Sequence, residues 1–113
     1  MPRFVLLEHD HPHLHWDLML EAGAVLRTWR LAGVPRPGTP VAALASFDHR
    51  LAYLDYEGPV SGDRGRVRRV DAGTFAWEDD RDGRVVLRME GGQFRGRAVL
   101  ERGETGEWSL ALL

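Results

Sequence analysis

The sequence contains no cysteine, and this absence excludes disulfide bonds, thiolate metal sites and cysteine nucleophiles. It also contains no lysine, so all 15 of its basic residues are arginines. No apolar run is long enough to cross a bilayer, since runs such as VAALA and SLALL are far too short. Any metal ion bound by this chain must therefore be held by histidine and carboxylate side chains.

The length of 113 residues suits one compact domain with a real hydrophobic core, and we expect a single domain over residues 1–113. The N-terminal apolar run is soon followed by acidic residues and lacks a small-residue cleavage site, so we expect no signal peptide, no membrane contact and a cytoplasmic location. The net charge of −2 excludes a surface coated in positive charge, although nucleic-acid binding needs only a local basic stripe.

Apolar and polar residues alternate with a period of two along most of the chain, and no stretch keeps the 3.6-residue period of a helix. The pattern predicts an all-β fold, a closed or nearly closed antiparallel β-barrel of about eight short strands, because closure leaves no exposed sheet edge. The proline- and glycine-rich stretch 32–40 predicts a surface loop. The strand-like segments from which these strands would form are 3–8, 13–21, 25–31, 41–47, 52–57, 66–71, 73–78, 84–89, 93–101 and 107–112.

The expected strand at 13–21 has two chemically different faces, because successive side chains of a strand point to opposite sides. One face is apolar and should fill the interior, and the other is polar and should lie on the outer wall. The apolar face carries Leu14, Trp16, Leu18 and Leu20, and the other carries His13, His15, Asp17, Met19 and Glu21.

Four of the five histidines fall in the segment HDHPHLHWD, residues 9–17. His15 and Asp17 leave the same face of the expected strand with Cβ atoms about 7 Å apart, and His9 ends the preceding strand, where it can complete a trio. Imidazole and carboxylate suit Mn, Fe, Co, Ni or Zn, and three protein ligands leave positions open for water or substrate. The sequence therefore predicts a divalent-metal site on the outer wall.

The alternative for this trio is a set of solvated surface histidines, one of which caps the turn before Pro12. For His11 and His13 a surface role is the preferred interpretation, because Pro12 forces a turn and the direction of their side chains cannot be derived.

A longer pattern runs through most of the chain. A His is followed after five residues by His-aromatic-Asp, then by a Trp about a dozen residues on, then by Asp-His with a Tyr four residues later, and by Glu-Gly. This pattern resembles the phosphoesterase domain of the bacterial DNA ligase D family. The matching residues are His9, His15–Trp16–Asp17, Trp29, Asp48–His49, Tyr53 and Glu57–Gly58.

The resemblance implies a manganese-dependent β-barrel enzyme that trims 3′ ends carrying a phosphate or a ribonucleotide, with zinc, cobalt or nickel as alternative metals. It implies that His9, His15 and Asp17 are metal ligands and that His49 and Tyr53 contact the scissile phosphate. The partners would be nucleic-acid 3′ ends or a related phosphoester, with a repair ligase and polymerase acting in trans on this stand-alone domain. Without the resemblance, His49 would be a hydrogen-bonded residue at a strand end and Tyr53 a half-buried strand residue.

Three cations of the family's phosphate clamp are replaced here. The family usually has arginines where this chain has Met19 and Val41, and a lysine after the strand that contains Trp29. A two-residue hairpin loop around Gly23 would pair Arg30 with His15 or Asp17 and make it a substitute clamp, whereas a three-residue loop would put Arg27 on that face.

These replacements leave two further functional hypotheses open. One is a module that retains the ion and binds a DNA end, a phosphate or a protein without turnover. The other is a barrel in which the metal is purely structural.

A basic stripe of Arg64, Arg66 and Arg68 would lie on one face of an extended segment, where it could follow a nucleic-acid backbone. The alternative is a solvated outer strand whose arginines pair with the acidic segment EDDRD.

Overall fold

The computed structural model describes all residues, 1–113. Its elements are β1 (Arg3–His9), β2 (His15–Ala22), β3 (Val25–Leu31), β4 (Val41–Arg50), the 3-10 helix η1 (Leu51–Leu54), β5 (Gly58–Pro59), β6 (Arg66–Arg81), β7 (Arg84–Gly91), β8 (Arg95–Arg102) and β9 (Trp108–Leu112). No helix in the structure has the length and apolarity needed to span a membrane.

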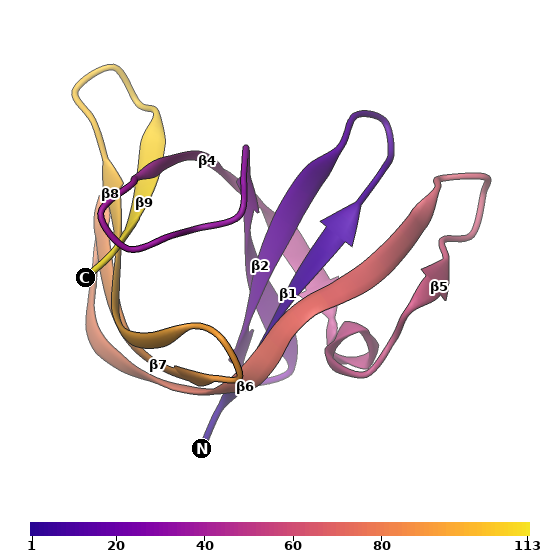
Figure 1. Cartoon of the computed structure of the whole chain (residues 1–113), viewed down its shortest axis with the longest axis horizontal. Coiled ribbons are helices and arrows are strands. Elements are labelled where there is room, and N and C mark those ends of the chain that lie inside the picture. Colours follow the sequence, from indigo (N-terminus) through magenta and orange to yellow (C-terminus); the bar gives the residue numbers. More distant parts are fainter.

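Eight of the strands form a closed ring in the order β1-β2-β3-β4-β9-β8-β7-β6, and β6 pairs back onto β1 (Figure 1). The remaining strand, β5, is only two residues long and pairs with β6 outside the ring. Every pairing between named strands is antiparallel. The all-β class and the closed antiparallel arrangement of about eight strands are thus confirmed.

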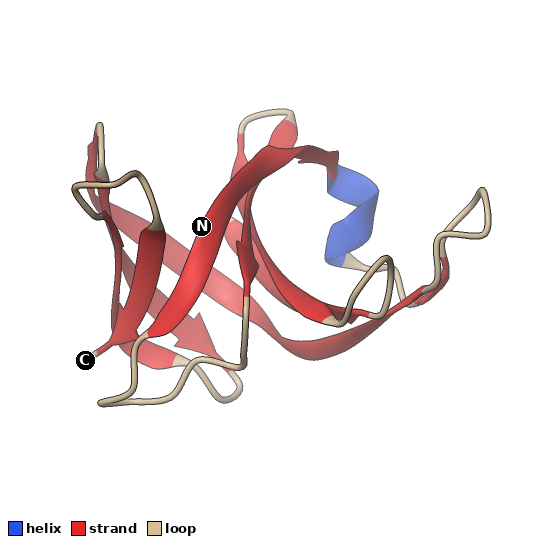
Figure 2. Ribbon diagram, turned by 90° about the horizontal axis from the view of Figure 1, so that it is seen from above, coloured by secondary structure: helices blue, strands red, loops and turns tan.

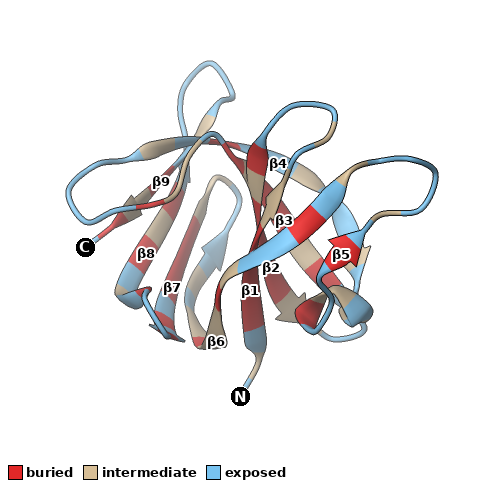
Figure 3. Cartoon of the chain, turned by 45° about the vertical axis from the view of Figure 1, so that its right-hand side comes forward, coloured by how far each residue is buried: buried red, intermediate tan, exposed pale blue.

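Two hydrophobic clusters lie on opposite faces of β1 and β2. Figure 3 shows that the middle of β1 is buried. The larger fills the ring with 16 buried residues, among them Leu6 and Leu18. The smaller lies outside the ring and consists of Val5, Leu7, Met19, Leu26, Leu54 and Val67. Burial on both faces explains why β1 reads as the continuous apolar run FVLL rather than as an alternating strand.

The 3-10 helix η1, blue in Figure 2, covers the smaller cluster. Leu51 and Leu54 are three residues apart, so they lie on the same side of a 3-10 turn and both pack against the cluster. The prediction of a strand at 52–57 was therefore wrong. After Arg50 the chain leaves the sheet, and these leucines bury apolar surface against β1 and its neighbours.

Other predicted boundaries were also wrong: β4 continues to Arg50 rather than ending at residue 47, and β8 begins at Arg95 rather than at residue 93. Residues 66–81 form one continuous strand rather than two. Gly73 lets this strand lie close to β7, because a Cβ at Gly73 would clash with the carbonyl oxygen of Glu90. The second strand begins at His15 rather than at residue 13, so Leu14 lies outside it and is 57% exposed instead of filling the interior.

Candidate active site

His9, His15 and Asp17 come together outside the ring, on the face of β2 that also carries Met19. His9 and His15 are directly paired across β1 and β2, and Asp17 follows His15 on the same face. One atom of Asp17, Oδ2, lies 3.2 Å from His15 Nε2 and 3.8 Å from His9 Nδ1, and the three potential ligand atoms lie within 4.8 Å of one another. His15 and Asp17 are buried, with 5% and 3% of their surface exposed.

Backbone carbonyl groups determine which ring nitrogens of this trio carry a proton. His15 Nδ1 lies 2.8 Å from the carbonyl oxygen of His13, and His9 Nε2 lies 2.8 Å from that of Arg64. Since a carbonyl oxygen only accepts, both of these nitrogens must donate. In the neutral form of each ring, the opposite nitrogens, His15 Nε2 and His9 Nδ1, present lone pairs toward Asp17, as metal-binding histidines do.

The donor set of this trio suits a divalent cation. His15 Nε2 and Asp17 Oδ2 are both acceptors at 3.2 Å, so the pair is favourable only with a proton or a cation between them. The second carboxylate oxygen, Asp17 Oδ1, is buried without a hydrogen-bond partner, which is costly for a polar atom. Two imidazoles and one carboxylate are ligands that Mn²⁺, Zn²⁺ and related ions accept.

A β-bulge in β4 puts His49 on the same face of the sheet as this trio. Thr28 pairs with Ser46 and Leu26 pairs with His49, so one residue of β3 opposes two residues of β4 between these pairs. Without the extra residue, His49 would point to the other face, because a shift of one residue reverses every side chain beyond it.

His49 is held through its Nδ1 atom. This nitrogen lies 2.9 Å from the hydroxyl of Thr28 and 3.0 Å from the carbonyl oxygen of Phe47. The Thr28 hydroxyl uses its proton on the carbonyl oxygen of Leu26, so it must accept from His49, and both partners require a proton on Nδ1. The lone pair of the neutral ring is therefore on Nε2, which makes no hydrogen bond within the protein.

Burial lowers the pKa of the His49 ring below its usual value of 6.5, and the carboxylate of Asp17 and the carbonyl of Phe47 offset this only in part. His9 and the guanidinium of Arg30 lower the pKa further. The ring is therefore mainly neutral at pH 7, with a free acceptor at Nε2.

A pocket of about 430 Å³ is lined by His9 and Asp17 of the metal-ligand trio and by His49. Tyr53, on η1, lies edge-on to the His49 ring with centroids 5.7 Å apart. The guanidinium groups of Arg30 and Arg50 form no ion pair or hydrogen bond within the protein, which leaves them available to an anion. The lining consists of His9, His11, Pro12, Asp17, Arg30, Phe47, Asp48, His49, Arg50, Tyr53, Val60 and Arg64.

The hairpin register places Arg30 directly opposite Asp17, as the two-residue loop at Gly23–Ala24 requires. Arg27 instead lies over Trp29 and Trp77 and pairs with Asp80, so it is not on the metal face. Met19 is 1% exposed within the outer cluster, where a charged side chain would be buried.

Three residues of the site were not singled out from the sequence. Thr28 is two residues before Arg30 on the same strand, so the two side chains lie on the same face. The predicted hairpin was therefore sufficient to place Thr28 on the metal face. Phe47 and Arg50 flank Asp48–His49, but their place in the pocket depends on the bulge and carries no sequence signal. His11 also lines this pocket, whereas the side chain of His13 is exposed and only its carbonyl contacts His15.

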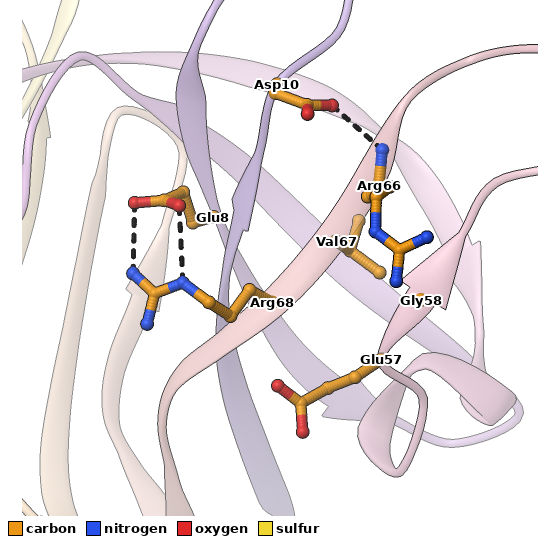
Figure 4. Close-up of a pocket in the computed structure, with 7 residues that line it drawn as sticks. All are labelled: Glu8, Asp10, Glu57, Gly58, Arg66, Val67 and Arg68. Atoms are coloured by element: carbon orange, nitrogen blue, oxygen red, sulfur yellow. Dashed lines mark hydrogen bonds and ion pairs between the residues drawn. The ribbon is translucent and has the colours of Figure 1, made fainter.

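The three arginines of the predicted basic stripe, Arg64, Arg66 and Arg68, lie in different surroundings. Arg64 precedes β6 and folds back onto Ser61, whereas Arg68 pairs with Glu8. Figure 4 shows the hollow around Arg66, which is shared with the carboxylates Glu8, Asp10 and Glu57. Because three carboxylates outnumber its two arginines, this hollow is a poor phosphate site. The acidic segment 78–82 pairs with other arginines, including Arg27, Arg88, Arg97 and Arg102.

Residues 7–102 match the family model of the DNA ligase D 3′-phosphoesterase domain, which confirms the resemblance drawn from the sequence motifs. The chain is 33% identical over 114 residues to the multifunctional non-homologous end joining DNA repair protein LigD of Mycobacterium tuberculosis (strain ATCC 25618 / H37Rv), with 93% of this chain and 15% of that protein covered. It is 29% identical over 122 residues to the multifunctional non-homologous end joining protein LigD of Pseudomonas aeruginosa, with 96% and 14% covered. The chain thus spans about one-seventh of the length of these curated relatives.

Proposed function

Because this chain belongs to the DNA ligase D 3′-phosphoesterase domain family, we propose that it is a metal-dependent phosphoesterase acting on nucleic-acid 3′ ends. It removes a 3′-phosphate or a 3′-terminal ribonucleotide during DNA break repair by non-homologous end joining. The observation that carries this proposal is that His9, His15 and Asp17 bring their potential ligand atoms together beside a pocket, and that His9 and Asp17 line this pocket with His49 and two unpaired arginines.

We propose that His9 Nδ1, His15 Nε2 and the carboxylate of Asp17 bind the ion, for which Mn²⁺ is the first candidate. When bound, a divalent ion would neutralise phosphate charge and help to orient water for attack. The carbonyl groups of His13 and Arg64 keep the two imidazoles in the tautomers that this role needs.

The remaining residues act on the phosphate itself. Arg30 and Arg50 bind its non-bridging oxygens through charge-assisted hydrogen bonds. His49, neutral and with its lone pair on Nε2, accepts a proton from the attacking water. Tyr53 presents its ring edge to His49 and confines the imidazole on that side of the pocket.

The direct test is phosphate release from a 3′-phosphorylated DNA primer in the presence of Mn²⁺, with parallel reactions in Zn²⁺, Co²⁺ and Ni²⁺. A primer that ends in one ribonucleotide is assayed beside it. We expect phosphate release that EDTA stops and that Asp17→Asn abolishes, whereas Asp82→Asn, which changes an exposed carboxylate in the turn between β6 and β7, retains it. No release with any of these metals would remove the proposal.

The replacement of the family's cation by buried Met19 favours a second candidate, a module that binds ends without turnover. Metal-dependent binding of a 3′-phosphorylated oligonucleotide, with no product over many hours, would support this candidate over the enzyme. A purely structural ion would instead raise the melting temperature without any affinity for phosphate.

A further inference from the structure

Phe47 is an unusual residue for the rim of a polar pocket. It is a large apolar side chain with 70% of its surface exposed, on β4 beside the proposed catalytic histidine. One face of its ring stacks on His49, with centroids 4.6 Å apart and planes inclined by 19°. Because a ring has two faces and His49 covers one, the exposed surface includes the other face.

The surroundings of this free face are cationic. Phe47 and Arg30 line the candidate pocket together and also share a second, shallow hollow with Leu44, Ala45 and Ser46. Arg50, which also lines the candidate pocket from this end of β4, likewise has no ion partner. An exposed aromatic ring beside unpaired arginines is the combination with which proteins hold single-stranded nucleic acid: the bases stack on the ring and the phosphates meet the cations.

The β-bulge accounts for this arrangement. Phe47 and Asp48 are the two residues of β4 that oppose a single residue of β3. A bulge re-aims the side chains that it contains, and here the rings of Phe47 and His49 stack. A base on the outer face of Phe47 would therefore continue a stack that already leads to the histidine.

We propose that the free face of Phe47 is a stacking platform for the nucleobase at the 3′ end of the substrate. The site is thereby selective for ends that carry an unpaired base over ends that carry a bare sugar phosphate. This inference rests on the proposed function and adds the class of end that the site accepts.

Two 5′-labelled, single-stranded, 3′-phosphorylated oligonucleotides of equal length test it, one ending in adenosine and the other in an abasic sugar. Binding is measured by fluorescence anisotropy, and kcat/KM by phosphate release with Mn²⁺. The native protein should favour the adenosine end, and Phe47→Ala should reduce that preference about 5- to 150-fold, as expected for the loss of one stacked base. Phe47→Trp should preserve it, and Leu113→Ala, which changes an exposed apolar side chain at the end of the chain and outside both hollows, should leave it unchanged.

The preference between the two ends separates stacking from a role in which Phe47 only supports His49. Support alone would make Phe47→Ala slow both substrates equally. An equal effect on both ends, or equal treatment of both ends by the native protein, would overturn the inference and leave the phosphoesterase proposal standing. Failure of the native protein to bind or cleave either end would overturn both.

Discussion

The hydroxyl of Thr28 lies 2.9 Å from Nδ1 of His49 and 3.1 Å from the carbonyl oxygen of Leu26. This buried hydroxyl joins β3 to the bulged strand β4 and orients the proposed proton acceptor. The tautomer of His49, and hence the availability of Nε2, follows from this contact and from the carbonyl of Phe47.

Thr28→Val keeps the shape of the side chain and removes the hydroxyl. We expect kcat to fall about 10- to 100-fold, because misplacing a catalytic group by about 1 Å costs about 100-fold. The free energy of unfolding should fall by only about 1–2 kcal/mol, the usual cost of one lost hydrogen bond in a buried place. Thr28→Ser is the control and should retain most of the activity. Native kcat in the valine variant would contradict a positioning role.

The lowered pKa of His49 predicts that turnover depends on pH. The neutral ring is the active form, so kcat/KM should be level around pH 7 and should fall at acidic pH, with a midpoint below 6.5. Below pH 6.5 the unfolded state binds more protons at this residue than the folded state, so His49 should also lower the free energy of unfolding as pH falls. An NMR titration of the imidazole measures the pKa directly. A value above 6.5 would refute this prediction.

Binding of Mn²⁺ should raise the melting temperature, since a ligand that binds only the folded state stabilises it by mass action. At 100 times the dissociation constant the gain is about 2.7 kcal/mol, which corresponds to roughly 10 °C for a domain of this size. Asp17→Asn should abolish the shift, whereas Asp48→Asn should keep it, because Asp48 lines the pocket outside the ligand trio. Equal shifts in both variants would place the ion elsewhere.

Arg30→Ala should raise the KM for a 3′-phosphorylated primer by about 10-fold or more. A hydrogen bond to a charged group contributes about 1.5–3 kcal/mol, and Arg30 has no partner within the protein that would compete for it. Arg36→Ala is the matched control, because Arg36 is an exposed arginine in the loop that precedes β4 and does not line the pocket. An unchanged KM and turnover in the Arg30 variant would show that it is not the substitute clamp.

Substitution of Asp71 tests the stability of the fold without changing the candidate site. Its buried carboxylate accepts hydrogen bonds from the backbone N–H groups of Gly92, Gln93 and Phe94 at 2.9–3.1 Å. Asp71→Ala should lower the free energy of unfolding by roughly 2–4 kcal/mol in urea titrations, because these donors lose their acceptor. Asp82→Ala, which changes an exposed carboxylate in the neighbouring turn, should have no measurable effect.

The sequence alone determined the local geometry of the site. His15 and Asp17 share a face because the pleat of a strand has a period of two. The hairpin at Gly23 limited the substitute clamp to Arg30 or Arg27, and the observed register then put Arg30 opposite Asp17. The all-β class follows from the same periodicity.

Only the tertiary structure decided which other residues lie in the candidate site beside His15 and Asp17. His49 lies on the metal face because of a bulge, and a bulge depends on how β4 pairs with β3 rather than on its own residues. The segment 51–54 forms a 3-10 helix whose leucines pack against the apolar cluster outside the ring. That cluster exists only after β1, β2, β3 and β6 have assembled. Pairing register and burial are properties of distant partners, which a local pattern does not contain.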